Sequence, residues 1–562
     1  MNILLTAINA KYIHSNLAVY SLRACAGEYR DAVELAEYTI NNQKDYILEE
    51  LYKRKPDVLC FSCYIWNIDY VTDIAREYKK LCPSVPIWVG GPEVSYEVEA
   101  FLRENPYIDG VMIGEGEDTF RELCGYYAHK RKLSDIAGIA FRKNSTGNST
   151  SNRTSVNNAG CKADEIVFTS PRPIKNMSEI PFCYDTLDDF SNRIIYYESS
   201  RGCPFSCSYC LSSVDKTLRF RDTEIVKREL KFFIDQKVPQ IKFVDRTFNC
   251  NHAHAMELWR FIKANDNGVT NFHFEISADL LNQEELELIS DMRPGLIQLE
   301  IGVQSTNEVT IKEIHRTMKL ERLKEVVRLI QSGNNIHEHL DLIAGLPYED
   351  YDSFGRSFDE IYELKPNQLQ LGFLKVLKGS YMFEHAAEYG IVYHDKPPYE
   401  VMSTKWLSFD DVIKIKRVED MLEVYYNSGQ FEITMKLMEC IFDSAFEFFQ
   451  ELGDFYEANG YFGMSHSRIR RCEILLEFLA LYLHGCDSDA ITSVGLSENH
   501  GDRDNTDFDE NAQIYKMIQE SLIFDLYYRE NCKSRPRWAT DIGSFKHMTH
   551  AYCKNGKLSH VE

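Results

Sequence analysis

Three cysteines in one short loop carry the strongest chemical signal in the sequence. Cys203, Cys207 and Cys210 stand in the run SRGCPFSCSYCL, with the spacing CxxxCxxC. Thiolate sulfur is the ligand that holds iron–sulfur clusters. A loop of this length can offer three thiolates to an iron–sulfur cube and leaves one iron without a protein ligand. Such an iron can bind an outside molecule and pass it an electron.

Zinc is the competing interpretation of the same loop. A distant Cys183, Cys250 or a histidine could join the three thiolates and close a tetrahedral zinc site. The uneven spacing, the aromatic Tyr209 before the last cysteine and the position after a strand all favour the cluster. The other cysteines are scattered, so we expect reduced thiols and no disulfide framework.

The loop follows the first of six strand-like runs that alternate with helical patterns. The strands are expected at 194–197, 240–244, 272–277, 296–303, 339–343 and 368–374. Helical spacing fills the gaps at 223–236, 254–264, 283–292, 320–332 and 353–364. This order predicts a partial parallel (β/α)6 barrel over 191–385, whose site lies at the carboxyl ends of the strands.

An earlier series of strands and helices predicts an N-terminal doubly wound parallel sheet over 1–140. Strands are expected at 2–7, 57–63, 86–89 and 110–113, with helices at 21–28, 71–81 and 96–104. Ligands of such sheets bind beyond the carboxyl ends of the strands. The residues that fall there are Asn9, Tyr64, Asn67, Gly90, Gly91, Gly114, Glu115, Gly116 and Glu117.

The remaining segments carry less chemistry. Residues 141–190 are expected to be a flexible loop and linker, because 143–163 is dominated by Ser, Thr, Asn and Gly. Asn144, Asn148 and Asn152 form NxS/T triplets, and we do not expect them to be glycosylated. Residues 386–562 are expected to be mostly α-helical, including 473–484 and 514–530, with a polar interruption at 497–511.

The composition narrows the classes of function. The chain has 562 residues, with 63 Lys and Arg against 86 Asp and Glu, and a formal net charge of -23. This balance argues against general nucleic-acid binding and against binding to anionic membranes. No apolar run reaches the length of a membrane span, and the N-terminus has no secretory signal pattern. The sequence predicts a cytoplasmic protein.

The cysteine motif, with Tyr209 before its last cysteine, resembles the signature of the radical S-adenosylmethionine superfamily. The resemblance implies that the three cysteines hold a 4Fe-4S cluster and that S-adenosylmethionine chelates the open iron through its amino and carboxylate groups. An electron from the cluster would then cleave a carbon–sulfur bond to give methionine and a 5'-deoxyadenosyl radical that abstracts hydrogen. The Tyr209 backbone would face the adenine.

Other strand ends extend this resemblance over 195–380. The family pattern makes Asp245, in the run FVDRTFN, a candidate acceptor for the amino group of the cofactor. In the run LEIGVQS it makes Glu300, Gln304 and Ser305 candidates for ribose, carboxylate or substrate contacts. Glu275 ends the third strand, Arg316 could meet the cofactor carboxylate, and Gly345 lets the backbone approach the adenine. Acids at strand ends can instead be solvated or paired, and glycines can simply form turns.

The order of the two α/β regions is similar to that of the cobalamin-binding class of this superfamily. The runs at 9–14 and 64–67 look like its phosphate-side and corrin-side loops. The DxHxxG motif, which supplies an axial histidine to cobalt in many cobalamin domains, is absent. His14 is the nearest substitute and fits a surface or structural histidine better. A bound corrinoid would then lack a protein imidazole, or the domain would be a scaffold that binds no cobalamin.

The resemblance implies a radical S-adenosylmethionine enzyme, with methyl transfer from cobalamin as one outcome and an external donor such as flavodoxin or ferredoxin supplying electrons. The alternatives are a non-methylating rearrangement or oxidoreductase enzyme and a non-catalytic sensor of cluster and corrinoid. A methylthiotransferase would need a second set of three cysteines, which Cys60, Cys63 and Cys82 do not reproduce. The helical C-terminal region resembles an uncharacterised extension. The sequence specifies neither the substrate nor a catalytic residue.

Overall fold

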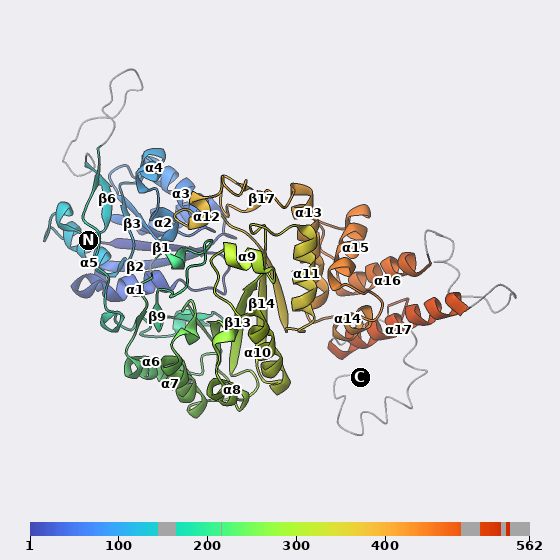
Figure 1. Ribbon diagram of the computed structural model, residues 1–562. Helices are drawn as coiled ribbons and strands as arrows, with labels where there is room; N and C mark the ends of the chain where they lie inside the picture. Colours follow the sequence, from blue (N-terminus) through green and yellow to red (C-terminus); the bar gives the residue numbers. More distant parts are fainter. Residues whose placement is uncertain (144–164, 215, 485–505, 530–535, 540–562) are drawn as a thin grey trace, which may run out of the picture.

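Two α/β sheets and a bundle of helices make up the protein (Figure 1). The computed structural model describes residues 1–143, 165–214, 216–484, 506–529 and 536–539. The three NxS/T triplets, most of the segment at 143–163 and the part of the polar interruption before Thr506 therefore lie outside the described residues.

The N-terminal sheet has seven strands in the order β2-β1-β3-β4-β5-β6-β7. Its strands are β1 (Ile3–Asn9), β2 (Val33–Thr39), β3 (Val58–Ser62), β4 (Ile87–Gly90), β5 (Gly110–Met112), β6 (Ile139–Arg142) and β7 (Ile166–Phe168). The helices are α1 (Leu17–Cys25), α2 (Lys44–Arg54), α3 (Ile68–Leu81), α4 (Val98–Glu104) and α5 (Glu117–Tyr127). The strand order reverses between β1 and β3, and this reversal creates a crevice at their carboxyl ends.

The predicted doubly wound sheet is confirmed, with additions at both edges. The sequence pattern did not predict β2 and α2, because β2 (VELAEYT) carries two glutamates and resembles no buried strand. Strands β1 to β5 pair in parallel, whereas β6 and β7 pair antiparallel. The edge position of β2 explains why polar residues are tolerated there, since only one side of an edge strand is paired.

The second sheet is a six-stranded parallel partial barrel in the order β15-β14-β13-β12-β11-β8. Its strands are β8 (Ile195–Tyr197), β11 (Gln240–Phe243), β12 (Asn271–Ile276), β13 (Ile297–Gln304), β14 (His337–Ala344) and β15 (Gln368–Phe373). The helices that follow the strands are α6 (Thr223–Asp235), α7 (His252–Ala264), α8 (Gln283–Ser290), α9 (Glu308–Glu313), α10 (Leu320–Gly333) and α11 (Tyr351–Tyr362). The predicted (β/α)6 arrangement is confirmed.

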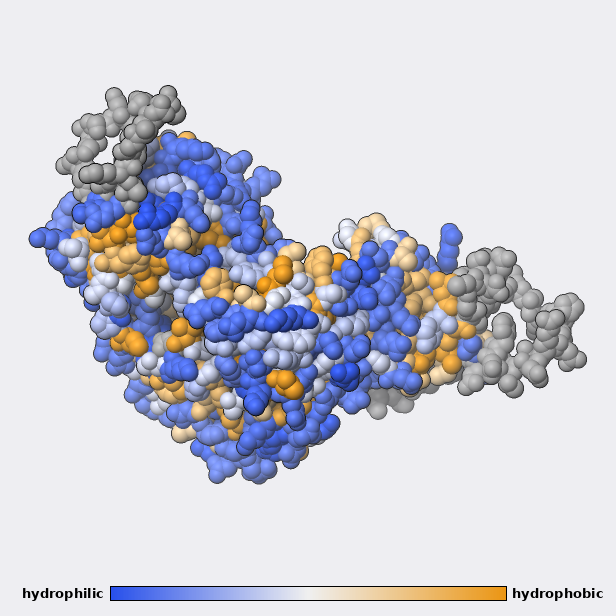
Figure 2. Space-filling model, turned by 45° about the horizontal axis from the view of Figure 1, so that its top comes forward, coloured by the Kyte–Doolittle hydropathy of each residue, from blue (hydrophilic) through white to orange (hydrophobic). Residues whose placement is uncertain are grey.

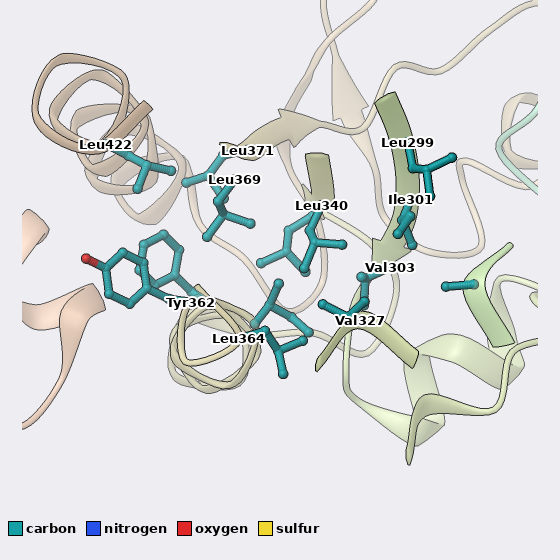
Figure 3. Close-up of a cluster of buried hydrophobic side chains, with 14 of the residues drawn as sticks. Leu299, Ile301, Val303, Val327, Leu340, Tyr362, Leu364, Leu369, Leu371 and Leu422 are labelled. Atoms are coloured by element: carbon teal, nitrogen blue, oxygen red, sulfur yellow. The ribbon is translucent and has the colours of Figure 1, made fainter. Parts of the chain in front are cut away.

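The two faces of the barrel strands differ in polarity. Leu299, Ile301 and Val303 of β13 point to the outer face, where they pack with side chains of the helices, as Figure 3 shows. The alternate residues of the same strand, Gln298 and Glu300, point to the lumen and are partly buried. The outer face therefore forms the core, and the lumen keeps polar groups for a ligand.

The C-terminal helices lie on the side of the barrel away from the N-terminal sheet (Figure 1). They are α13 (Phe409–Leu422), α14 (Glu432–Met438), α15 (Ala445–Ala458), α16 (Arg468–His484) and α17 (Thr506–Arg529), with a π-helical turn at Glu423–Asn427 after α13. The connection from the barrel contains α12 (Tyr381–Glu384), β16 (Val392–Tyr393) and β17 (Val401–Ser403). Helix α15 packs against α11 and α13, so this bundle supports the outer wall of the barrel.

Both free edges of the open barrel are covered. At β15, the Leu369 N–H donates to Asn427 Oδ1 at 2.9 Å, and Asn427 Nδ2 donates to the Leu369 carbonyl at 2.7 Å. At the start of β8, the Ile194 N–H donates to the Ile13 carbonyl at 2.8 Å. A side-chain amide and a loop of the N-terminal domain thus replace neighbouring strands, which protects the edges from pairing with other chains.

The surface is mostly hydrophilic in the view of Figure 2, with apolar patches over the C-terminal helices. The exposed apolar side chains of α16 and α17 include Leu481, Tyr482, Met517, Phe524 and Tyr528. Among the residues that the structure describes, no helix has both the length and the apolar character needed to cross a membrane.

We predict that Asn427→Ala destabilises the barrel edge. The change removes both hydrogen bonds to Leu369 and a third to Glu423, and it leaves the Leu369 backbone groups unpaired, which costs about 1 to 3 kcal/mol. Urea unfolding followed by circular dichroism should show a lower midpoint than in the wild type. Asn41→Ala, at an exposed position, is the matched control. Equal midpoints for Asn427→Ala and the control would contradict this role.

Candidate functional site

The cysteine loop is fixed at both of its ends and in its middle. The short antiparallel strands β9 (Ser200–Arg201) and β10 (Arg219–Phe220) bracket the three cysteines. Within the loop, the Ser208 N–H donates to the Ile314 carbonyl at 2.9 Å, and the Met382 N–H donates to the Ser208 carbonyl at 2.9 Å. Residues from after α9 and from α12 therefore hold the loop against the barrel mouth.

The three thiols are partly exposed and have different neighbours. Cys203 Sγ lies 3.9 Å from Thr247 Oγ1, and Cys207 Sγ lies 3.8 Å from Arg316 Nη1. Burial raises the pKa of Cys203. Within the described ranges, no three His, Cys, Asp or Glu side chains already converge closely enough to hold a single metal ion. The ligands of an iron–sulfur cube bind separate irons, so the three thiolates need not meet at one point.

A strained residue lies beside this loop, at the end of β13. Gln304 has a φ of 77°, which is unfavourable for a residue with a side chain. A Cβ on Gly302 would lie 2.2 Å from Gln304 Nε2, so a side chain there would displace the Gln304 amide, whereas Arg316 Nη2 would be in ordinary contact at 3.5 Å. Arg316 donates to the Gly302 carbonyl and contacts Tyr209 Oη at 3.4 Å. The end of β13 thus holds the Arg316 guanidinium that contacts Cys207, and the Gln304 amide lies over the same glycine.

Several polar atoms near this point are buried and have no partner. They are Gln304 Oε1, Arg316 Nε and Asp341 Oδ1. Buried polar atoms are nearly always hydrogen-bonded in native proteins, so unpaired ones need an explanation. The Arg316 donor and the Gln304 acceptor, both without partners, fit a zwitterionic ligand that carries both carboxylate and amino groups. The residues present therefore fit S-adenosylmethionine beside a cluster on the three cysteines.

The lumen below the mouth contains carboxyl groups in contrasting states. Glu300 Oε2 lies 2.7 Å from Lys242 Nζ and 3.0 Å from His273 Nε2. Burial alone would raise the pKa of Glu300, but His273 and Lys242 outweigh it and lower the pKa to about 2. Burial, reinforced by the charges of Glu300 and Glu275, raises the pKa of Asp341 to about 8. Burial also raises the pKa of Glu275. The lumen thus combines one firmly ionised carboxylate with two carboxyls that hold their protons more tightly than usual.

Two of the sequence-predicted site residues are fully occupied by the protein itself. Asp245 accepts from the Ser199 N–H at 2.9 Å and from the Ser199 and Ser200 hydroxyls at 2.6 Å each, and it is fully buried. The Ser305 hydroxyl donates to Glu349 at 2.6 Å and is also fully buried. These residues tie strand ends to neighbouring loops, so their contacts within the protein position the mouth.

Gly345 faces another part of the chain. Its φ is 88°, and a Cβ there would lie 2.6 Å from Val401 Cγ1 of β17. The connection that carries Val401 also reaches the N-terminal domain, because Tyr399 donates to Glu93 and a Cβ on Gly379 would clash with Tyr96. This connection therefore covers the mouth at β14 and packs on the segment that follows β4 in the N-terminal domain.

Asn67, Tyr64 and Trp66 lie at the crevice of the N-terminal sheet, where Trp66 Nε1 donates to the Ile8 carbonyl at 3.1 Å. Asn67 Nδ2 donates to the Ile8 carbonyl at 2.9 Å and the Ser62 carbonyl at 3.0 Å, and Asn67 Oδ1 accepts from the Tyr64 N–H at 2.8 Å. The rings of Tyr64 and Trp66 stack with centroids 4.4 Å apart. Asn67 ties β1 to β3, and the stacked rings supply a flat apolar surface at the crevice.

The glycines predicted for this crevice have different structural roles. A Cβ on Gly91 would lie 2.4 Å from the Cys63 carbonyl oxygen, so Gly91 lets the ends of β3 and β4 approach each other. Gly90 is in ordinary contact with Met112. A Cβ on Gly114 would meet nothing within 4 Å, so the backbone after β5 borders open space. Glu115 is engaged elsewhere, since it accepts from Arg219 at 2.6 Å.

His14 lies between the two sheets. Its Nδ1 is 2.7 Å from Tyr196 Oη of β8, and its neighbour Ser15 donates to the Ile194 carbonyl at 2.8 Å. Burial, with the nearby charges of Lys11 and Lys242, lowers the pKa of His14. The imidazole is therefore neutral near pH 7 and is used in a structural contact between the domains, in agreement with the structural histidine expected from its sequence context.

Sequence reasoning missed the lumen residues Lys242 and His273 and the arginines at the base of the cysteine loop, Arg201 and Arg219. The amino-acid sequence did contain a signal for Lys242 and His273. Parallel strands covered on both faces are usually continuous apolar runs, whereas β11 to β14 alternate polar and apolar residues. That alternation in the amino-acid sequence is itself an indication of a polar lumen.

Comparisons with known proteins agree with this geometry. Residues 3–124 match the family model of the B12 binding domain, and residues 197–361 match that of the Radical SAM superfamily. Residues 387–560 match a model described as a protein of unknown function, DUF4080.

Relatives with reported activities cover part of the chain. The cobalamin-dependent radical SAM methyltransferase TokK of Streptomyces tokunonensis is 27% identical over 363 residues, which are 60% of this chain and 49% of TokK. An anaerobic magnesium-protoporphyrin IX monomethyl ester cyclase of Rubrivivax gelatinosus is 22% identical over 357 residues, 61% of this chain and 60% of the cyclase. The chain thus spans about half the length of TokK.

A solved structure shows the same fold over nearly the whole chain. The cobalamin-dependent S-adenosylmethionine radical enzyme OxsB, with aqua-cobalamin and S-adenosylmethionine bound, superposes with a TM-score of 0.59 at 14% identity. The match covers 99% of this chain and 84% of OxsB.

We predict that Asp341→Asn makes the stability of the protein less sensitive to a rise in pH between 5 and about 8.5. The folded pKa of Asp341 is about 8, well above the ordinary value of 3.8, so its proton stabilises the fold below the lower pKa and this contribution is lost as pH rises toward 8. The asparagine lacks this loss, which is at most about 1.4 kcal/mol per pH unit. The variant should therefore gain stability relative to wild type between pH 5 and about 8.5.

The measurement is urea unfolding of both proteins at a series of pH values, in the same cofactor state. Asp291→Asn serves as the control because the Asp291 side chain is exposed and its carboxyl pKa is lowered by Lys263. A stability difference between Asp341→Asn and wild type that does not change with pH would show that Asp341 is ionised in the folded protein.

Proposed function

The chain belongs to the radical SAM superfamily, in the class that carries an N-terminal B12 binding domain, and we propose that it is a cobalamin-dependent radical enzyme that methylates its substrate. When bound, the cluster supplies the electron that cleaves S-adenosylmethionine, and the corrinoid carries the methyl group. The residues of the chain hold these groups, orient them and exclude water from them.

One observation carries the proposal: the carboxyl ends of the two parallel sheets face each other. Arg201, which follows β8, donates to Glu117 after β5 at 2.8 Å, and Arg219 donates to Glu115 at 2.6 Å. The charges of Glu198 after β8 and Arg246 after β11 also act on the phenol of Tyr64 after β3. Burial, with Cys63 and Glu198, raises the pKa of Tyr64 to about 12. Ligand sites of both sheets lie at such ends. A group on the N-terminal sheet and one in the barrel would therefore be neighbours.

Individual residues are assigned roles by their contacts. Cys203, Cys207 and Cys210 would hold the cluster, and the Arg316 guanidinium would lower the cost of negative charge on Cys207. The free Arg316 Nε–H would donate to the carboxylate of S-adenosylmethionine, and Gln304 Oε1 would accept from its amino group. Asp341, which keeps a proton near neutral pH, could donate a hydrogen bond in the lumen. Tyr64, Trp66 and the backbone at Gly114 would border the corrinoid.

One relative supports a second candidate function, a radical reaction without methyl transfer. The cyclase of Rubrivivax gelatinosus is named for ring formation and resembles this chain over a similar length to TokK. A non-methylating radical rearrangement would use the same cluster and the same barrel mouth. Product analysis with S-adenosylmethionine labelled in its methyl group separates the two outcomes, since only methyl transfer moves the label to the substrate.

We further propose an external electron donor such as flavodoxin or ferredoxin, and a cytoplasmic location. The support is chemical. The cluster must be reduced once in each radical cycle, and the free cysteines of the described residues suit a reducing compartment.

We predict that Cys203→Ala, Cys207→Ala and Cys210→Ala each lose the cluster and with it essentially all formation of 5'-deoxyadenosine. Each change removes one of three thiolate ligands. Iron and sulfide analysis, visible absorption and an anaerobic assay of 5'-deoxyadenosine provide the measurement. Cys440→Ala, at an exposed cysteine of the C-terminal region, is the matched control.

A wild-type protein that holds the cluster but forms no 5'-deoxyadenosine under reducing conditions would instead support a non-catalytic sensor. A colourless protein that contains zinc after anaerobic reconstitution would disprove the cluster altogether.

We predict that His14→Ala binds as much corrinoid as the wild type. His14 is hydrogen-bonded to Tyr196, so the change removes a contact worth about 1 kcal/mol between the domains and removes no cobalt ligand. Corrinoid content and the electron paramagnetic resonance (EPR) spectrum of the cobalt(II) state provide the measurement. Loss of corrinoid, or a nitrogen splitting that disappears in the variant, would identify His14 as an axial ligand.

A further inference from the structure

A cluster of charged side chains joins the N-terminal sheet to the base of the cysteine loop. It consists of Glu115, Glu117, Glu198, Arg201 and Arg219, and we call it the Glu115 cluster. Arg201 lies 3.2 Å from Glu115, 2.8 Å from Glu117 and 2.7 Å from Glu198. Arg219 lies 2.6 Å from Glu115. All of the side chains that bridge the two domains are mostly buried.

Glu115 compensates a repulsion in the ribbon that brackets the cysteines. Arg201 and Arg219 are direct partners across β9 and β10. Like charges at directly opposed positions of an antiparallel pair destabilise it. Glu115 Oε1 contacts both guanidinium groups, at 3.2 Å and 2.6 Å. The turn after β5 therefore favours closure of the ribbon by placing Glu115 against both arginines, in addition to Glu198, which lies 2.7 Å from Arg201.

The turn that presents Glu115 is itself fixed. Gly114 has a φ of 74°, and a Cβ on Gly116 would lie 2.9 Å from Leu22 Cδ2 of α1, so the turn packs closely on that helix. The other oxygen of Glu115 accepts from the Lys175 N–H at 3.2 Å. Because these contacts hold the Glu115 carboxylate, it cannot easily move together with Arg201 or Arg219. A shift of the turn therefore shifts the ribbon, and a shift of the ribbon shifts the turn.

We propose that Glu115, Arg201 and Arg219 are positioning residues that set the separation between the cluster on the cysteine loop and the corrinoid on the N-terminal sheet. The inference rests on the proposed function. Arg201 is two residues before Cys203, and Glu115 directly follows Gly114, whose backbone borders the open space after β5. The Glu115 cluster thus links Cys203, the first proposed ligand of the iron–sulfur cluster, to the turn at Gly114 that would border the corrinoid.

The placement of these charges distinguishes them from the many ion pairs on the surface. Exposed pairs such as Lys130 with Glu28, which are 60% and 64% exposed, contribute little to stability and are screened by salt. Arg219 and Glu117 are 13% and 7% exposed. Screening is much weaker at such positions, so the Glu115 cluster can fix a geometry over the whole physiological range of ionic strength.

The test measures the separation directly in the full-length protein. After anaerobic reconstitution with iron, sulfide and cobalamin, the reduced iron–sulfur cluster and cobalt(II) are both paramagnetic, and pulsed EPR reports the distance between them. The variants are Glu115→Gln and the pair Glu115→Gln with Arg219→Gln. The pair also removes the Arg219 charge that Glu115 compensates, and it serves if the single variant folds poorly. Glu28→Gln is the matched control at an exposed ion pair.

The expected result is a narrow distance distribution in the wild type and in Glu28→Gln, and a broadened or shifted one in both Glu115 variants. Iron, sulfide and corrinoid contents should stay at wild-type levels, because no proposed ligand is changed. A distribution in the paired variant as narrow as that of the wild type, at the same distance, would overturn the inference.

If the wild type binds no corrinoid, the cobalamin part of the proposed function fails, and the inference is judged by hydrogen exchange. The paired variant should then exchange faster than Glu28→Gln in the peptides that contain 114–118 and 199–203. Unchanged exchange in both peptides would overturn the inference independently of any cofactor.

Discussion

Burial of charge at the meeting point of two parallel sheets is the constraint on which the architecture depends. The carboxyl ends of both sheets face each other, so the side chains there lose water that would otherwise solvate them. The protein compensates most of them with specific partners, as with Glu300 between Lys242 and His273, or Glu115 between Arg201 and Arg219. Because those partners come from different strands and domains, pairing the charges also fixes the positions of the loops.

The hydrogen-bond partners of each side chain distinguish two groups of residues. One group positions the site through bonds within the protein, and the other has buried polar atoms without a partner. Asp245, Ser305 and Asn67 lie at the positions predicted for ligand contacts, but their hydrogen bonds are made within the protein. Gln304 and Arg316 keep buried atoms without partners. Strain at Gln304 points to the same place, since an unfavourable φ persists only where the surroundings enforce it. The second group therefore has the stronger claim to contact a cofactor.

The sequence was sufficient for the fold class because the barrel strands are short, regular and bounded by helices. Its six strands were each located within a few residues, and the cysteine loop follows β8 as expected. Strand β2 was missed because an edge strand can carry Glu34 and Glu37 without the apolar pattern of a buried one. The antiparallel pairing of β6 and β7 depends on contacts distant in the chain, which periodicity does not encode.

The candidate site was predictable to a smaller extent, for a physical reason. The cysteines are recognisable because a loop motif keeps its ligands adjacent in sequence. Whether a strand-end acid contacts a ligand depends on the partners that the fold brings to it, and these are remote in sequence, such as Ser199 for Asp245. Glu115 illustrates the difficulty. Its Gly-Glu-Gly context resembles a turn that borders a ligand, yet its carboxylate is held by two arginines more than eighty residues further along the chain. The glycines place the turn, and the charge on Glu115 then joins that turn to the loop that holds the cysteines.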